Sequence, residues 1–177
     1  MAVLDAEHVE RALVWRFSLG SKNAASLTVL EPTRVAALVC GSGPPMPTTE
    51  ATQKRWLAMA EAVETDEGMT SLLLSLGTDE AAVAQSLARN DSAALSAAMA
   101  GTSGWSPLPD QIRVPSLWYT GSEESPALSA EVLELASRVG AETHVIPGAS
   151  HVQAFRRADD VLRTVRPFLD RHAHNAN

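Results

Sequence analysis

Cysteine, long apolar stretches and clustered positive charge are nearly absent from this 177-residue sequence. The single cysteine, Cys40, excludes an internal disulfide and a thiolate metal cluster, and its place at the end of an apolar run predicts a buried thiol. No run approaches 18 consecutive apolar residues, so no membrane-spanning helix is expected. A formal net charge of −7 without any basic block argues against nucleic acid or an anionic membrane as the main partner. A small uncharged substrate fits this composition better.

The first residues lack the composition of a secretory signal. Asp5, Glu7, Glu10 and Arg11 stand where such a signal needs an uninterrupted apolar core. We therefore expect a soluble, cytoplasmic protein. With 45% hydrophobic residues and no internal repeat, the chain is long enough for one packed core and too short for two. The sequence predicts a single domain over residues 1–177.

Short apolar runs alternate with helical patterns along the chain. Each expected strand is short and ends at turn residues, and the four lie at 12–15, 34–40, 114–120 and 142–146. Helices are expected around them at 2–11, 21–30, 129–139 and 158–170. From about 46 to 110 the pattern is helical only, which predicts a helical cap inserted between strands, with helices near 50–65, 67–76, 79–89 and 92–100. The expected fold class is α/β, with a mostly parallel sheet of about four strands and flanking helices.

A serine lies where the first expected strand meets a helix. A tight turn at such a junction projects the hydroxyl of Ser18 above the sheet edge and turns the N–H of the next residue, Leu19, toward a developing oxyanion. Gly20 meets the need for a small residue there, whereas Arg16 occupies the position where a first glycine is usual. Ser18 is therefore a candidate nucleophile. Taken alone, the same residues also fit a serine that only caps a helix.

An acid and a histidine follow two later strands. The strand at 114–120 leads into a glycine turn that carries Glu124, and the strand at 142–146 leads into a loop that carries His151. The carboxyl ends of parallel strands are where open α/β sheets build their sites. Glu124 and His151 are therefore candidate partners of the serine, and Glu123 is the alternative acid if the turn is shifted by one residue.

Several stretches together resemble successive landmarks of the α/β-hydrolase fold family, from just before the nucleophile turn onward. They are VERALV at 9–14, FSLG at 17–20, EPTRVAALV at 31–39, VPSLWYTG at 114–121, IPGASH at 146–151 and PFL at 167–169. The chain order serine, acid, histidine is also that of the family. The resemblance implies a serine hydrolase acting on a carboxylic ester or related acyl compound, with Ser18 as nucleophile, His151 as base and Glu124 orienting the histidine.

Other polar and aromatic residues fit a structural role as well as a substrate-binding or metal-binding one. In the cap, Trp56, Met59 and Trp105 are candidates to line an apolar acyl pocket, and packing between helices is the competing role. The remaining histidines of interest lie within a strand or in the C-terminal tail, at His144, His172 and His174. No third ligand of fixed position accompanies them, so we predict no metal site, and the resemblance implies no cofactor.

The resemblance also implies an incomplete α/β-hydrolase fold, shortened at its N-terminus. The complete fold takes a second oxyanion N–H from a loop after an earlier strand, and its sheet continues beyond the nucleophile strand. An open apolar edge at residues 12–15 predicts a homodimer, dependence on a missing N-terminal half, or instability. The competing hypothesis is a non-catalytic remnant or binding module that keeps the C-terminal half of the fold. Arg16 and the missing oxyanion loop favour that hypothesis.

Overall fold

A computed structural model of the protein describes residues 1–43, 49–104 and 106–176. The chain divides into two compact units. The first, which we call the α/β unit, consists of Met1–Pro45 and Pro107–Asn177, and the second, the helical unit, is Met46–Ser106. In the described stretches no helix combines the length and the apolar character needed to span a bilayer.

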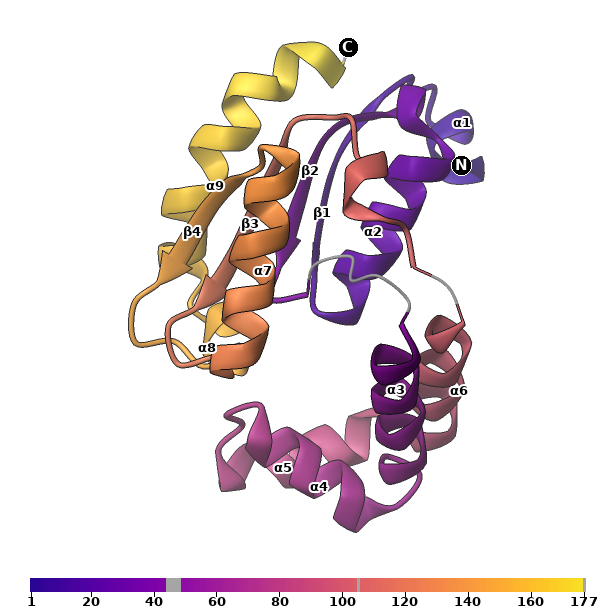
Figure 1. The fold of residues 1–177 in the computed structure, drawn as a ribbon, viewed down its shortest axis with the longest axis vertical. Coiled ribbons are helices and arrows are strands. Elements are labelled where there is room, and N and C mark those ends of the chain that lie inside the picture. Colours follow the sequence, from indigo (N-terminus) through magenta and orange to yellow (C-terminus); the bar gives the residue numbers. More distant parts are fainter. Residues whose placement is uncertain (44–48, 105, 177) are drawn as a thin grey trace. The chain divides into compact units, whose positions relative to one another are not determined.

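The α/β unit contains a four-stranded parallel sheet in the order β1-β2-β3-β4 (Figure 1). The strands are β1 (Ala12–Phe17), β2 (Val35–Gly41), β3 (Ser116–Gly121) and β4 (Glu142–Ile146). The two central strands, β2 and β3, are buried along their whole length, as expected for apolar strands covered on both faces. β1 and β4 form the two edges of the described sheet. Because all four strands run in one direction, the loops that follow them meet at one end of the sheet.

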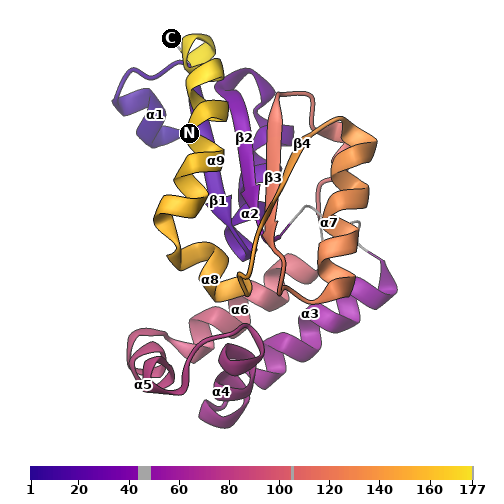
Figure 2. The same cartoon turned by 90° about the vertical axis from the view of Figure 1, so that its left-hand side faces the viewer.

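Helices cover both faces of this sheet (Figures 1 and 2). One face carries α2 (Leu19–Leu30) and α7 (Pro126–Val139), and the other carries α8 (His151–Arg156) and α9 (Ala158–His172). The main core lies between the sheet and the α8–α9 layer. Its buried residues are Ala37, Val39, Leu117, Tyr119, Ile146, Ala149, Ala154, Val161, Val165 and Phe168. The expected alternation of strands and helices is confirmed.

The helical unit contains α3 (Glu50–Ala62), α4 (Asp66–Ser75), α5 (Glu80–Arg89) and α6 (Ser92–Ser103). Each of these helices begins with a side-chain cap, in which a hydroxyl or carboxylate oxygen accepts a backbone N–H of the first turn. The capping residues are Thr49, Thr65, Asp79 and Asp91. The unit has its own small core of buried residues, namely Ala60, Val63, Met69 and Met99.

Two segments differ from the sequence prediction by more than a few residues at their ends. The N-terminal helix α1 spans only Ala2–Ala6 instead of residues 2–11, because His8 adopts a left-handed φ of 54° that ends the helical path. The guanidinium of Arg34 then holds the following segment by donating to the carbonyl oxygens of Val9 (3.0 Å) and Glu10 (2.7 Å). The second difference is α8, which was not expected as a separate helix. A capping box between Ser150 and Gln153 starts it.

Candidate active site

Ser18 lies in a sharp turn between β1 and α2. Its backbone has φ 53° and ψ −127°, a conformation that residues with a side chain rarely adopt. The Ser18 N–H donates to the Gly41 carbonyl at 2.7 Å, so the turn stays attached to the end of β2. The backbone of Gly43 passes so close that a methyl group there would lie 2.5 Å from the Ser18 carbonyl oxygen. This geometry is that of a nucleophile elbow.

The elbow accommodates the unusual Arg16. A Cβ atom added to Gly20 would lie 3.4 Å from the Arg16 Cβ, so the missing side chain of Gly20 leaves room for the stem of the arginine. The Arg16 side chain is exposed. Ser21, which the sequence analysis did not single out, is fully buried, and its hydroxyl lies 2.9 Å from the carbonyl oxygen of Arg16 and 3.1 Å from that of Gly41. It therefore links α2 to β1 and β2 directly beneath the turn.

His151 is the first residue of α8 and is buried beside Ser18. Its Nε2 atom lies 3.0 Å from the Ser18 hydroxyl oxygen, and its Nδ1 atom lies 2.8 Å from Oε2 of Glu124. Because an ionised carboxylate only accepts hydrogen bonds, both contacts are satisfied by the tautomer with a proton on Nδ1 and a lone pair on Nε2 facing the Ser18 hydroxyl. The structure thus joins the three residues that the sequence singled out into one hydrogen-bonded chain.

The two adjacent glutamates have different surroundings. Glu124 is only 7% exposed and contacts His151, whereas the side chain of Glu123 is exposed to solvent. Glu123 instead contributes its backbone N–H, which donates to the Ala149 carbonyl at 2.9 Å. Of the two candidate acids, Glu124 is therefore the one in contact with the histidine.

The loop after β3 and the loop after β4 are held together by several backbone contacts. Ser122 donates its N–H to the Ile146 carbonyl at 3.0 Å, and its hydroxyl accepts the N–H of Gly148 at 2.7 Å. Gly121 has no space for a side chain, because a methyl group there would overlap the Ala149 carbonyl. Since these loops carry Glu124 and His151, the contacts set the distance between these two side chains.

An aromatic cluster packs against the histidine ring. The Phe17 ring centroid lies 5.0 Å from that of His151 and 5.4 Å from that of Phe155, with interplanar angles of 60° and 48°. Tilted ring contacts of this kind are favourable and restrict ring motion. Phe17 immediately precedes Ser18, so the same residue contacts the His151 ring and leads into the Ser18 turn.

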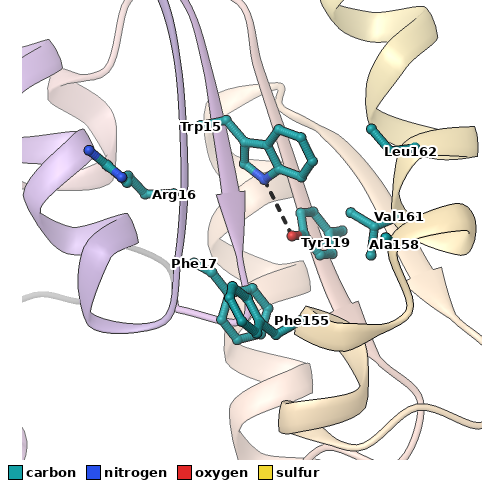
Figure 3. Close-up of a pocket in the computed structure, with 8 residues that line it drawn as sticks. All are labelled: Trp15, Arg16, Phe17, Tyr119, Phe155, Ala158, Val161 and Leu162. Carbon is teal, nitrogen blue, oxygen red and sulfur yellow. Dashed lines mark hydrogen bonds between the residues drawn. The ribbon is translucent and has the colours of Figure 1, made fainter. Parts of the chain in front are cut away.

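A groove of about 310 Å³ lies beside this cluster, between β1 and the α8–α9 layer (Figure 3). We call it the β1 groove, and it is lined by Trp15, Arg16, Phe17, Tyr119, Phe155, Ala158, Val161 and Leu162. The Trp15 indole N–H donates to the Tyr119 hydroxyl at 3.3 Å, whereas the Arg16 side chain points away from these aromatic rings (Figure 3). Burial raises the pKa of Tyr119, so its phenol stays neutral at physiological pH.

Leu19 directly follows Ser18 and is the first residue of α2. The N–H groups of the first helical turn have no carbonyl partner within the helix, and they lie at the positive end of its dipole. The backbone N–H of Leu19 is thus available to a negative charge that develops next to Ser18. This position agrees with the geometry that the sequence predicts for an oxyanion donor.

The proposed substrate-contacting residues belong to the helical unit. Trp56 and Met59 are partly buried and pack against the small core around Val63 and Met99. Trp105 lies outside the described residues. Contact of these side chains with an acyl group stays a prediction, and helix packing is the role visible for Trp56 and Met59.

The other candidate histidines take no part in the hydrogen bonds that join Ser18, His151 and Glu124. His144 is exposed in β4, and the His172 ring packs on Phe168 with centroids 4.8 Å apart. His174 lies in the short C-terminal 3₁₀ turn (Ala173–Ala176). Within the ranges that the structure describes, no group of three or more His, Cys, Asp or Glu side chains could hold a metal ion. Cys40 is buried as predicted, and this burial raises the pKa of its thiol to about 12.

Comparisons with known proteins identify the fold. No family model and no curated protein matches the sequence. Among solved structures, the chain is similar to the enol-lactonase from Burkholderia xenovorans LB400, with 21% identity and a TM-score of 0.74 over 95% of this chain and 69% of that one. It is also similar to MenH from S. aureus, with 16% identity and a TM-score of 0.80 over 97% of this chain and 73% of that one.

A thermophilic esterase from Thermogutta terrifontis gives a similar result, with 18% identity and a TM-score of 0.76 over 96% of this chain and 69% of that one. At these identities the likeness concerns the fold. The chain has the α/β-hydrolase fold, as the sequence landmarks predict, in the form of a four-stranded parallel sheet with helices on both faces.

Proposed function

We propose that this chain is a serine hydrolase that cleaves a carboxylic ester or a related acyl compound. The observation that carries the proposal is the continuous chain of hydrogen bonds from Ser18 through His151 to Glu124, with separations of 3.0 and 2.8 Å. A serine that only caps a helix would accept an N–H of the first turn, but the Ser18 side chain makes no such bond with α2. The names of the similar structures, which include an enol-lactonase and an esterase, support the same class of reaction.

The first half of the proposed reaction acylates the serine. His151 Nε2 takes the hydroxyl proton while Ser18 Oγ forms a bond to the substrate carbonyl carbon, whose oxygen becomes an oxyanion. The N–H of Leu19 stabilises that oxyanion, and the Glu124 carboxylate stabilises the imidazolium. The carbon–oxygen bond to the alcohol then breaks, and the leaving alkoxide takes the proton from His151.

The second half releases the acid. A water molecule gives a proton to His151 Nε2 and attacks the acyl carbon. The bond between that carbon and Ser18 Oγ then breaks, and His151 returns the proton to the serine oxygen. The aromatic ring of Phe17 covers one side of the imidazole and keeps water from that side, which strengthens the interaction between the imidazolium and the carboxylate. No step requires a redox or group-transfer cofactor.

Fluorophosphonate labelling tests this proposal directly. We expect the folded protein to be labelled on the peptide that contains Ser18, and we expect p-nitrophenyl esters to be hydrolysed. Ser18→Ala should abolish both signals, whereas Ser75→Ala, which changes an exposed serine of the helical unit, should leave both unchanged. If protein shown to be folded by circular dichroism is not labelled, the hydrolase proposal is wrong and a non-catalytic binding role is favoured.

A further inference from the structure

Ser21 is a buried serine in the first turn of α2, three residues after Ser18. A hydroxyl on a helix commonly donates to a carbonyl oxygen of its own helix, as that of Thr28 does to Ala24 further along α2. The Ser21 hydroxyl instead faces two carbonyl oxygens outside the helix, one on β1 and one on β2. Helix formation alone does not require such a contact.

This hydroxyl bridges the carboxyl ends of two neighbouring strands. The register pairs Arg16 with Cys40, so β1 and β2 end side by side beneath the Ser18 turn. Ser21 Oγ lies 2.9 Å from the Arg16 carbonyl oxygen and 3.1 Å from that of Gly41. A hydroxyl has a single proton to donate, so the two carbonyl oxygens share it. One donor therefore holds the start of α2 against both strands.

The backbone of Ser18 is connected to the same group of residues. Its N–H donates to the Gly41 carbonyl at 2.7 Å, and its carbonyl oxygen accepts the Ser21 N–H at 2.9 Å. The Gly41 carbonyl oxygen thus contacts both the N–H of Ser18 and the hydroxyl of Ser21. A residue with a side chain rarely adopts the φ of 53° seen at Ser18, so the surrounding contacts must hold it there.

The carbonyl group of Ser21 is also in contact with the sheet. Its oxygen lies 3.9 Å from Sγ of Cys40, whose buried thiol is the donor. Ser21 is fully buried, so water does not reach this position to replace a lost hydrogen bond. The N–H, the hydroxyl and the carbonyl of Ser21 therefore all contribute to fixing the first turn of α2 between Ser18 and the strands.

We propose that Ser21 is a positioning residue for the nucleophile, and that its hydroxyl holds the first turn of α2 where catalysis requires it. This inference rests on the proposed serine-hydrolase activity. Leu19 lies in the same turn, and its N–H is the donor for the oxyanion. The bridge made by Ser21 therefore fixes the Ser18 oxygen and the oxyanion donor as one unit. A small displacement of that unit lowers turnover without weakening substrate binding.

Ser21→Ala tests the role, because it removes the hydroxyl and keeps the rest of the side chain. We expect kcat for a p-nitrophenyl ester and the rate constant of fluorophosphonate labelling to fall about 10-fold per folded molecule, with KM unchanged. Thr28→Val is the matched control, since it removes a buried hydroxyl whose partner lies within α2. Both variants should be less stable in urea, but Thr28→Val should keep the wild-type rates.

Ser21→Cys separates loss of the hydrogen bond from loss of fit. A thiol is a weaker donor of similar shape, so its labelling rate should lie between those of the wild type and Ser21→Ala. If Ser21→Ala does not fold, Ser21→Cys is compared with the wild type alone, and an equal rate would overturn the proposal.

The outcomes also separate this role from the hydrolase proposal itself. A labelled wild type together with an equally fast Ser21→Ala, or an equal loss of rate in Thr28→Val, would overturn the positioning role and leave the hydrolase proposal standing. Folded wild-type protein that is not labelled would overturn both.

Discussion

Gly121 lies directly against the backbone carbonyl of Ala149, with no room for a methyl group between them. Gly121 ends β3 and begins the loop of Glu124, and Ala149 belongs to the loop of His151. The hydrogen bond of 2.8 Å between Glu124 and His151, which are 27 positions apart in the chain, therefore depends on the close approach of the Gly121 and Ala149 backbones.

Gly121→Ala should push these two loops apart. We expect the free energy of unfolding in urea to fall by about 1–3 kcal/mol, since the added methyl meets backbone that cannot move aside cheaply. The rate of ester hydrolysis by the molecules that remain folded should also fall. The matched control is Gly101→Ala within α6, where an added Cβ meets nothing within 4 Å. That change should leave stability unchanged or raise it by up to about 1 kcal/mol, and equal losses in the two variants would contradict this account.

Glu124→Gln should leave the shape of the site intact and remove its negative charge. Without the carboxylate the imidazolium is no longer stabilised and the correct tautomer is no longer enforced, so kcat for a p-nitrophenyl ester should fall by about 10³–10⁴-fold. Glu123→Gln changes the exposed neighbour by the same chemistry and should have little effect. A large loss of kcat in Glu123→Gln, with little loss in Glu124→Gln, would show that Glu123 is the acid and would contradict the role proposed for Glu124.

The backbone of Ser18 predicts a conflict between stability and activity. A φ of 53° with ψ −127° is strained for serine and alanine but accessible to glycine. We expect Ser18→Gly to be more stable than Ser18→Ala by about 1 kcal/mol or more in thermal or urea unfolding, although both are inactive. Neither change removes a helix cap, because the Ser18 side chain does not cap α2. Equal stability of the two variants would mean that the turn is relaxed in solution.

The Cys40 thiol should react only after unfolding. The thiolate is the reactive form, and burial raises the pKa of Cys40 from 9.0 to about 12, so at pH 8 the folded protein holds a neutral thiol. A folded-state pKa above the unfolded value stabilises the protein below pH 9, and this contribution is lost as pH rises toward 12. Ellman's reagent should therefore label Cys40 quickly in urea and very slowly in buffer, and Cys40→Ala should show a weaker decline of stability above pH 9.

The sequence predicts the order of strands and helices well because each strand is a short apolar run bounded by turn residues. β4 has the expected bounds, and β1 extends two residues further because Arg16 and Phe17 pair with Cys40 and Gly41. The end of α1 at Ala6 is not visible in the sequence, since nothing there marks the left-handed backbone that His8 adopts after the helix. The start of α8 could have been found from Ser150 and Gln153, which fit the capping-box spacing.

The finer features of the site depend on contacts between distant parts of the chain. Sequence spacing does not distinguish Glu124 from Glu123, because the choice is made by how the turn after β3 buries one side chain. The β1 groove likewise exists only once Phe155 and Leu162 of the last two helices pack beside Trp15. The burial of Ser21 cannot be predicted from the sequence, because no local pattern distinguishes a buried serine from an exposed one.

Ser18 and His151 are separated by 133 positions in the chain, and the bond between them closes nearly the whole α/β unit. We expect this pair to form late in folding, because closing a loop of this length costs chain entropy before the contacts that stabilise it are made. Reactivity of Ser18 toward a fluorophosphonate therefore measures completion of folding as well as chemistry. In a refolding experiment, labelling should appear after the helical signal in circular dichroism, and the delay gives the time that the sheet needs to assemble.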